Sequence, residues 1–404
     1  MNGGVRVKEL EKNITKIYYF DFFISFIFVG PIIVLFIESR GISFKDIMIL
    51  QSIFAIAIFA LEVPTGIIGD RLGRKKTITI ASFILVVSHI RYVLSDSFIE
   101  FLFAEILFAF AFAMFSGTIE AFIYDTLLEL NKEDEFKKIL GKKNFIGYIS
   151  SGLGAIMGGL LAKISLDFVF YANTLTLIVA PFIALSLTEP NYKKSTQKRA
   201  YKEIIDISKK IFFNGSNLKW IVVFSAIVYA FNQSVFWTYQ PYLKLCGVDL
   251  VYFGIIFASF QVVAAYSSKY AHNIEAKIGT FGSLILIVVM VGVSEILMGS
   301  FIYLFSFILI YAQQFVRGFK AVIISDIINK EANSTYRATI LSLVGFVSKL
   351  FVSIVMLIVG YIQDLYSIRV VLVLLGVLVL VFGFSIILII RSKNVVSKQD
   401  RKAK

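Results

Sequence analysis

Long apolar runs alternate with short polar stretches along the whole chain. Each run meets or approaches the ~20 residues that a helix needs to cross the roughly 30 Å hydrocarbon core of a bilayer. The pattern therefore predicts an all-α membrane protein with twelve transmembrane helices. The predicted helices cover residues 17–39, 46–69, 77–94, 98–122, 144–165, 168–187, 219–243, 249–270, 280–299, 300–322, 338–361 and 366–390.

The longest polar stretch divides these helices into two sets of six. An internal repeat supports the division, because a shift of 201 positions aligns glycines and an aspartate of the two halves. The aligned pairs are Gly117 with Gly318, Asp125 with Asp326, and Gly159 with Gly360. We expect an N-terminal six-helix bundle over 1–188, a cytoplasmic linker over 189–218, a C-terminal bundle over 219–390 and a cytoplasmic tail over 391–404.

Basic residues concentrate in alternate connections. If the N-terminus is cytoplasmic, the segments on that side hold 33 of the 40 Lys and Arg residues. The positive-inside rule then predicts a multi-pass protein of the plasma or inner membrane with both termini in the cytoplasm. The first apolar run is long enough to span the bilayer, so we interpret it as a retained helix and not as a cleaved signal peptide.

Composition narrows the classes of function. The net charge of +13 would suit nucleic acid, but the basic residues are dispersed over short loops beside apolar helices, where anionic lipid headgroups explain them. One cysteine and two distant histidines provide no disulfide, no transition-metal cluster and no Cys/His nucleophile pair, and no Walker loop is present. We expect no enzyme activity, no cofactor, no metal and no nucleic-acid partner.

The connection between the second and third predicted helices carries the most specific motif, Gly66-Ile-Ile-Gly-Asp70-Arg71-Leu72-Gly73-Arg74-Lys75-Lys76. Gly66 and Gly73 permit a tight turn and close helix approach, and an acid at a helix boundary can hold basic side chains of the same loop. For Arg71, Lys75 and Lys76, a purely topogenic role is the alternative interpretation.

This motif resembles the signature loop of the major facilitator superfamily, and the twelve-helix plan extends the resemblance over the chain. The stretches Glu62-Val-Pro-Thr-Gly66 and Arg337-Ala-Thr-Ile-Leu-Ser342 are similar to a prokaryotic subgroup of mostly uncharacterised members. The resemblance implies alternating access around a cavity lined by helices 1, 4, 7 and 10. It also implies a conformational latch formed by Asp70, Arg74 and Asp125.

Ionisable residues at membrane depth are costly, so they are candidates for function. Lys349 lies near the middle of 338–361, where it needs an acidic partner or an anionic substrate; a structural salt bridge is the alternative. Asp21 could supply that partner or carry the coupling proton. Alternatively, it is a helix-end acid that pairs with a base in a loop. Glu105 and Glu120 lie fifteen residues apart on one predicted helix, about 60° apart in azimuth and roughly 22 Å along its axis. Glu105 is the better proton-site candidate.

Helix ten carries a polar stripe of Gln313, Arg317 and Lys320. The stripe could attract an anionic substrate or pair with Glu120, whereas its cations could instead snorkel to the cytoplasmic surface.

Three further candidates lie on helices seven and eight. Asn232 and Gln261 lie at mid-membrane depth, where an amide bonds either a polar ligand or another helix. Trp237 could line a pocket for amphipathic molecules or face lipid. Glu295, Arg91 and His89 fall on helices that the resemblance places outside the cavity, so we exclude them from the site.

Together these features predict a secondary transporter whose partners are a small solute, protons and the lipid bilayer. The resemblance to the superfamily implies a monomer. Buried acids and aromatic residues favour proton-coupled export of a small amphipathic organic solute or drug. A proton-coupled importer of a small metabolite, or a membrane receptor that keeps the fold without transport, are the alternatives.

Overall fold

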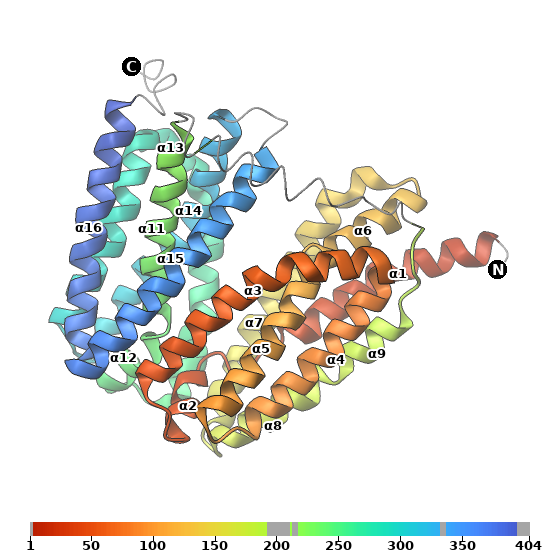
Figure 1. Cartoon of the computed structure of the whole chain (residues 1–404), viewed down its shortest axis with the longest axis horizontal. Helices are drawn as coiled ribbons and strands as arrows, with labels where there is room; N and C mark the ends of the chain where they lie inside the picture. Colours follow the sequence, from red (N-terminus) through yellow and green to blue (C-terminus); the bar gives the residue numbers. More distant parts are fainter. Residues whose placement is uncertain (1–2, 192–210, 212–216, 332–336, 394–404) are drawn as a thin grey trace. The chain divides into compact units, whose positions relative to one another are not determined.

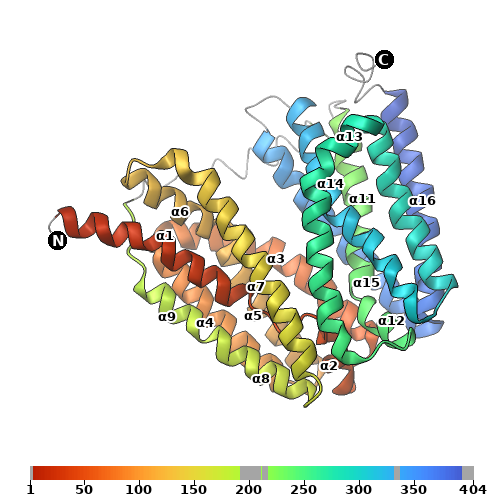
Figure 2. The same cartoon turned by 180° about the vertical axis from the view of Figure 1, so that it is seen from behind.

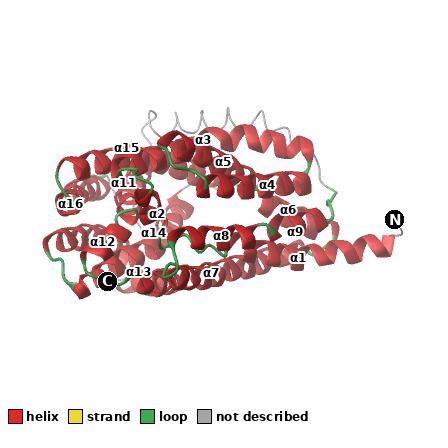
Figure 3. Cartoon of the chain, turned by 90° about the horizontal axis from the view of Figure 1, so that it is seen from below, coloured by secondary structure: helices red, strands yellow, loops and turns green. Residues whose placement is uncertain are grey.

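A computed structural model describes residues 3–191, 211, 217–331 and 337–393. These residues form helices joined by loops, with no strand among them (Figure 3). The all-α prediction is therefore confirmed. Most of the predicted linker over 189–218 and of the predicted tail over 391–404 lies outside the described residues.

The helices of the first half correspond to six apolar runs (Figure 1). Three of the runs are divided by breaks: 17–39 at residues 26–32, 98–122 at Ser116 and Gly117, and 168–187 at Ile178. The helices are α1 (Gly3–Ser25), α2 (Ile33–Ser39), α3 (Phe44–Leu72), α4 (Arg74–Val93), α5 (Phe98–Phe115), α6 (Thr118–Glu129), η1 (Glu133–Glu135), α7 (Phe136–Leu161), α8 (Leu166–Leu177) and α9 (Val179–Ser186).

The second half supplies the remaining spans. Its long helix α13 covers two predicted runs, 249–270 and 280–299, and changes direction at Gly279, whose φ of 74° and ψ of 169° are not helical (Figure 2). The helices are α11 (Leu218–Phe236), α12 (Tyr239–Leu245), α13 (Leu250–Ser300), η2 (Leu304–Leu309), α14 (Ile310–Glu331), α15 (Arg337–Leu365) and α16 (Ile368–Ser392).

In the described part, ten helices are long and apolar enough to cross a membrane. The count takes α13 once although its kink separates two spans, and it omits the first run, which is divided between α1 and α2. With these two, the described part of the chain has the twelve spans that the apolar pattern predicts. Helices are the form in which an open chain satisfies its backbone groups inside lipid.

Two compact units contain these helices. The first comprises residues 1–42, 53–196 and 249–258, and the second comprises 43–52, 197–248 and 259–404. The core of the first unit packs aliphatic and aromatic side chains of α1, α4, α5, α6 and α9, among them Ile17, Phe20 and Phe122. In the second unit, α11 packs against α15 and α16.

Close helix approach in the second unit depends on small residues. A Cβ placed on Gly292 of α13 would lie 2.9 Å from the carbonyl oxygen of Gly376 on α16, and one on Gly376 would lie 2.6 Å from that of Gly292. Small residues at such crossings are typical of helices packed within lipid. This contact holds the second half of α13 against its neighbour.

Candidate functional site

A cavity of about 360 Å³ lies in the second unit between α11, α14 and α15. It brings together three residues that the sequence suggested separately: Asn232, Arg317 and Lys349. Its apolar wall includes Ile324, Leu341 and Val344. The polar lining residues are Ser225, Tyr229, Asn232, Gln233, Arg317, Lys320, Ser325, Ser348 and Lys349.

The lining has a single sign of charge. Arg317, Lys320 and Lys349 line the cavity, and no Asp or Glu is among the described residues that do so. A cavity with low-dielectric walls and one sign of charge concentrates ligands of the opposite sign. The lining therefore favours a ligand that combines negative charge with apolar surface.

Lys320 is the most informative of the three cations. The residue is 9% exposed, and its ammonium lies 4.6 Å from the centroid of the Tyr229 ring, which also lines the cavity. Within the described ranges it forms no ion pair with a carboxylate. The interpretation that Lys320 snorkels to the cytoplasmic surface is wrong, because its side chain is buried beside the cavity.

Arg317 and Asn232 are held in place by amides outside the cavity wall. Nη2 of Arg317 donates to Oε1 of Gln261 on α13, at 2.8 Å. Asn232 donates to Oε1 of Gln313 at 2.6 Å, while the Gln313 amide donates to the carbonyl of Val291 at 3.0 Å. Gln313 is fully buried, and neither it nor Gln261 lines the cavity. These two residues therefore position the lining, and Gln313 bridges α11, α13 and α14.

Trp237 caps the end of α11 and does not line the cavity. Its ring packs edge-on against Phe236 with the centroids 5.8 Å apart. In the part of the chain that is described, its buried indole N–H has no hydrogen-bond acceptor.

Asp21, a candidate proton site, is paired within the first unit. Its Oδ1 lies 3.1 Å from Nζ of Lys143 on α7, and the two side chains are 7% and 16% exposed. Gly147 makes room for the carboxylate, since a Cβ there would lie 2.7 Å from Oδ2. The structure thus matches the alternative in which Asp21 pairs with a base, although the base is helical and not in a loop.

Glu105 and Glu120 occupy different surroundings. Glu105 is 4% exposed, and its Oε1 accepts a hydrogen bond from the hydroxyl of Tyr92 at 3.0 Å. Glu120 is exposed in the first turn of α6. The geometry expected from one continuous helix is wrong, because the helix ends at Phe115 and restarts at Thr118 after Gly117, which has a φ of 70°.

The signature loop joins α3 to α4. Nη1 of Arg74 lies 2.9 Å from Oδ1 of Asp70, and its Nε lies 3.4 Å from Oδ2 of Asp125 on α6. Gly73 forms the turn with a φ of 99°. Gly66 lies inside α3, so the turn is formed by Gly73, and close helix approach is the role left for Gly66 of the two that were expected.

Glu189 adds a contact that the sequence did not reveal. Its carboxylate accepts hydrogen bonds from the backbone N–H groups of Arg74 at 2.7 Å and of Lys75 at 2.9 Å, and so caps the start of α4. A Cβ on Gly73 would lie 3.1 Å from this carboxylate. Burial raises the pKa of Glu189 above its ordinary value of 4.5, against the opposite effect of the backbone donors. From the sequence, Glu189 was predicted only to be the first residue of the linker, and no contact with the signature loop was predicted for it.

Glu295 was excluded from the site on sequence grounds, yet it is fully buried on α13. Among the described residues, neither of its carboxyl oxygens has a hydrogen-bond partner. Its helix was expected to lie outside the cavity, and the apolar run around it gave no indication of which face turns inward.

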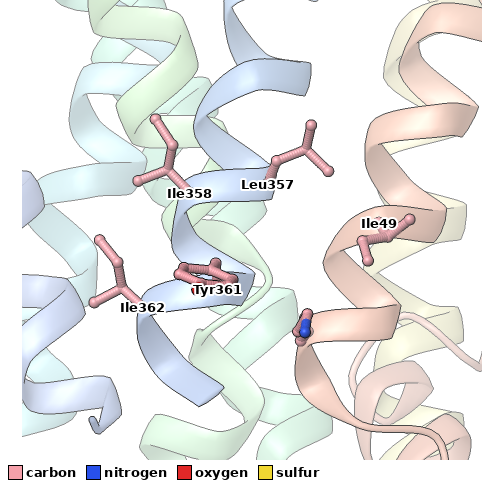
Figure 4. Close-up of a pocket in the computed structure, with 6 residues that line it drawn as sticks. Ile49, Leu357, Ile358, Tyr361 and Ile362 are labelled. Atoms are coloured by element: carbon pink, nitrogen blue, oxygen red, sulfur yellow. The ribbon is translucent and has the colours of Figure 1, made fainter. Parts of the chain in front are cut away.

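A second groove in the second unit has a lining that differs from that of the cationic cavity. This groove of about 530 Å³ is lined by Ile49, Leu357, Ile358, Tyr361, Ile362 and Lys45 (Figure 4). Nζ of Lys45 lies 3.8 Å from the carboxylate of Asp364. Because its wall is aliphatic and aromatic and its cation has a counter-charge, the groove offers less to a polar solute than the cationic cavity does.

Comparison with known proteins decides the family. The family model described as Major Facilitator Superfamily matches residues 17–351. The chain belongs to the Major Facilitator Superfamily. It is therefore a multi-pass membrane protein of that superfamily.

The individual relatives of this chain are distant from it in sequence. The uncharacterised MFS-type transporter YxaM of Bacillus subtilis is 28% identical over 238 residues, covering 57% of this chain and 58% of YxaM. The quinolone resistance protein NorA of Staphylococcus aureus is 23% identical over 258 residues, covering 61% of this chain and 64% of NorA. The matches thus span less than two thirds of either relative.

Solved structures agree on the fold. A mutant of the nucleoside transporter NupG aligns with a TM-score of 0.77 at 15% identity, over 92% of this chain and 98% of that one. The likeness establishes the major facilitator fold of twelve helices in two six-helix bundles.

Proposed function

We propose that this transporter exports a small amphipathic organic anion in exchange for protons. The observation that carries the proposal is the lining of the cavity, with three cations and no carboxylate among its described residues. Lys320 contributes most, because it is a buried cation with no acidic partner in the described part of the chain. Such a cation is costly, and an anionic ligand would compensate it.

The shape of the lining supports an amphipathic ligand. Ile324, Leu341 and Val344 provide apolar surface beside the cations, and Asn232 and Ser348 add hydrogen-bonding groups. Such pockets bind a ligand mainly through apolar contact and fix its orientation with a few polar groups. An arylsulfonate or arylcarboxylate combines these properties.

Export is supported by the similarity to NorA, a quinolone resistance protein. An inside-negative potential favours both the exit of an anion and the entry of a proton. Asp21 and Glu105 are the coupling candidates that the sequence suggested, and the contacts around Asp70 and Arg74 would bias the closed cytoplasmic state in alternating access. The plasma membrane, with both termini cytoplasmic, is the proposed location.

Import of an organic anion together with protons is the second candidate. The cationic lining favours import and export equally, because it binds an anion in either direction of transport. In cotransport, the proton cancels the charge of the anion that travels with it. The two modes differ in charge movement. Exchange of one monovalent anion for one proton moves two positive charges in the same direction, whereas one-to-one cotransport moves none.

Currents from proteoliposomes on a solid support test the proposal. The probe is p-toluenesulfonate, which stays ionised across the working pH range, and benzyltrimethylammonium is the cation matched in size. The proposal expects an inward current when the sulfonate is exported along its own gradient, and no response to the cation. Cotransport without current would favour import, while no counterflow of any probe would favour the receptor interpretation.

A further inference from the structure

Glu295 is a buried acid that the proposed mechanism does not use. It lies in the second half of α13, beyond the kink at Gly279, and it is 0% exposed. Both of its carboxyl oxygens lack hydrogen-bond partners in the described ranges. By contrast, the buried Asp21 and Glu105 of the first unit each contact a cation or a hydroxyl.

An ionised carboxylate in this position would be very unfavourable. Removal of an isolated charge from water costs several kcal/mol even after the protein relaxes, and an unpaired polar atom adds to that cost. The closed packing around α13 is therefore compatible with the neutral carboxylic acid. Ionisation requires water or another polar group to reach the side chain, which is what a helix movement in a transport cycle provides.

One titratable residue, Tyr239, is an electrostatic neighbour of Glu295 and of a residue that lines the cavity. Tyr239, which is 1% exposed, interacts electrostatically with both Glu295 and Arg317. Its hydroxyl accepts a hydrogen bond from Nε2 of Gln314 at 3.3 Å, and the Oε1 of that amide is itself without a partner in the described part. Arg317 in turn lines the cavity. Tyr239 is thus an electrostatic neighbour of both the buried acid and a cation that lines the cavity.

We propose that Glu295, fully buried and without a hydrogen-bond partner among the described residues, is the proton-carrying residue of the second unit. The proposal rests on the proton coupling of the proposed function. When the second unit opens to water, the carboxyl exchanges its proton; when the unit closes, the neutral acid is occluded. The resulting change of charge alters the electrostatic field in the second unit and with it the strength with which the cavity holds an anion.

The test compares Glu295→Gln with Glu295→Asp. The glutamine variant keeps the shape of the side chain and cannot exchange a proton, whereas the aspartate variant keeps an exchangeable proton and fills the site less well. A structural role predicts that Gln is tolerated better than Asp in every assay. A proton-carrying role predicts the opposite for coupling alone.

Two readouts are measured with p-toluenesulfonate in proteoliposomes whose membrane potential is clamped at zero. A gradient of one pH unit sustains about a tenfold accumulation at one proton per anion. Glu295→Gln should lose this accumulation and keep sulfonate exchange, and Glu295→Asp should keep both. Infrared spectra should show a protonated carboxyl band in the wild type that is absent from Glu295→Gln.

The possible failures are distinguishable. If the wild type accumulates sulfonate and Glu295→Gln does so equally, the assignment of Glu295 is wrong while the proposed function stands. An unchanged carboxyl band in Glu295→Gln would also refute the assignment. If the wild type does not respond to the pH gradient, or does not transport the sulfonate, the proposed function fails and the role of Glu295 fails with it.

Discussion

Replacement of Lys320 by methionine should stabilise the protein and weaken anion binding at the same time. Lys320 is 9% exposed and lies over the Tyr229 ring, without a carboxylate partner in the described part of the chain. Methionine has a similar length and fills irregular apolar space. Lys320→Met therefore removes the buried charge and leaves the packing of α14 nearly unchanged.

The magnitude follows from two opposing contributions. Burial of an unpaired cation costs several kcal/mol, and a desolvated cation–π contact returns about 2 kcal/mol. A net gain of about 2 kcal/mol would raise the unfolding midpoint by roughly 4–8 °C for a unit of this size. Loss of a charged contact worth about 1.5–3 kcal/mol would weaken p-toluenesulfonate binding roughly 10- to 100-fold.

Thermal unfolding of the purified protein and titration with p-toluenesulfonate measure the two effects. Lys330→Met is the matched control, because Lys330 lies on the same helix, is 47% exposed and pairs with Asp326. Its effects should stay within about 0.5 kcal/mol. If Lys320→Met lowers the midpoint and leaves sulfonate affinity unchanged, the ammonium is structural and the reasoning about the cavity is refuted.

Three further predictions concern the first unit and the energetics of transport. Asp21→Asn should destabilise the protein by about 3–5 kcal/mol, because it leaves the mostly buried ammonium of Lys143 without its carboxylate. Adding Lys143→Met should recover most of this loss in thermal unfolding, and equal stability of the single and double variants would contradict the pair. Because the pKa of Glu189 is raised above 4.5, its contribution to stability is present below that pH and is lost as the pH rises through the raised pKa. Glu189→Gln should flatten this part of the curve of unfolding midpoint against pH, and an unchanged slope would refute the argument. Exchange of one anion for one proton should gain a driving force of about 4.6 kcal/mol from a membrane potential of 100 mV. The measurement is sulfonate accumulation at a series of clamped potentials. Accumulation that does not depend on the potential would exclude this stoichiometry.

The number of spans could be predicted from the sequence because lipid leaves the backbone few choices. Apolar length alone identifies a spanning segment. The breaks at residues 26–32 and at Ser116 and Gly117 could not be predicted from apolar length, since apolar residues lie on both sides of each break. Where a helix stops depends on local backbone conformation, such as the positive φ of Gly117, which hydropathy does not record.

The site was predictable to the extent that its residues share one helix face. The stripe of Gln313, Arg317 and Lys320 follows from helical spacing, and Arg317 and Lys320 do line the cavity. The burial of Lys320 and Glu295 depends on which neighbours pack against each face, and spacing along one helix does not determine that. Glu189 caps α4 across more than a hundred residues of sequence, a contact that only the fold creates.

Binding of matched ions to the purified transporter tests the central claim most directly. The change in unfolding midpoint is measured with p-toluenesulfonate and with benzyltrimethylammonium, for the wild type and for Lys349→Gln. A ligand at a hundred times its dissociation constant stabilises the folded state by about 2.7 kcal/mol. The account predicts that the sulfonate stabilises the wild type, that Lys349→Gln loses most of this effect, and that the ammonium ion does nothing. Stabilisation by the ammonium ion in both proteins, with no effect of the sulfonate, would contradict an anion site in the cationic cavity.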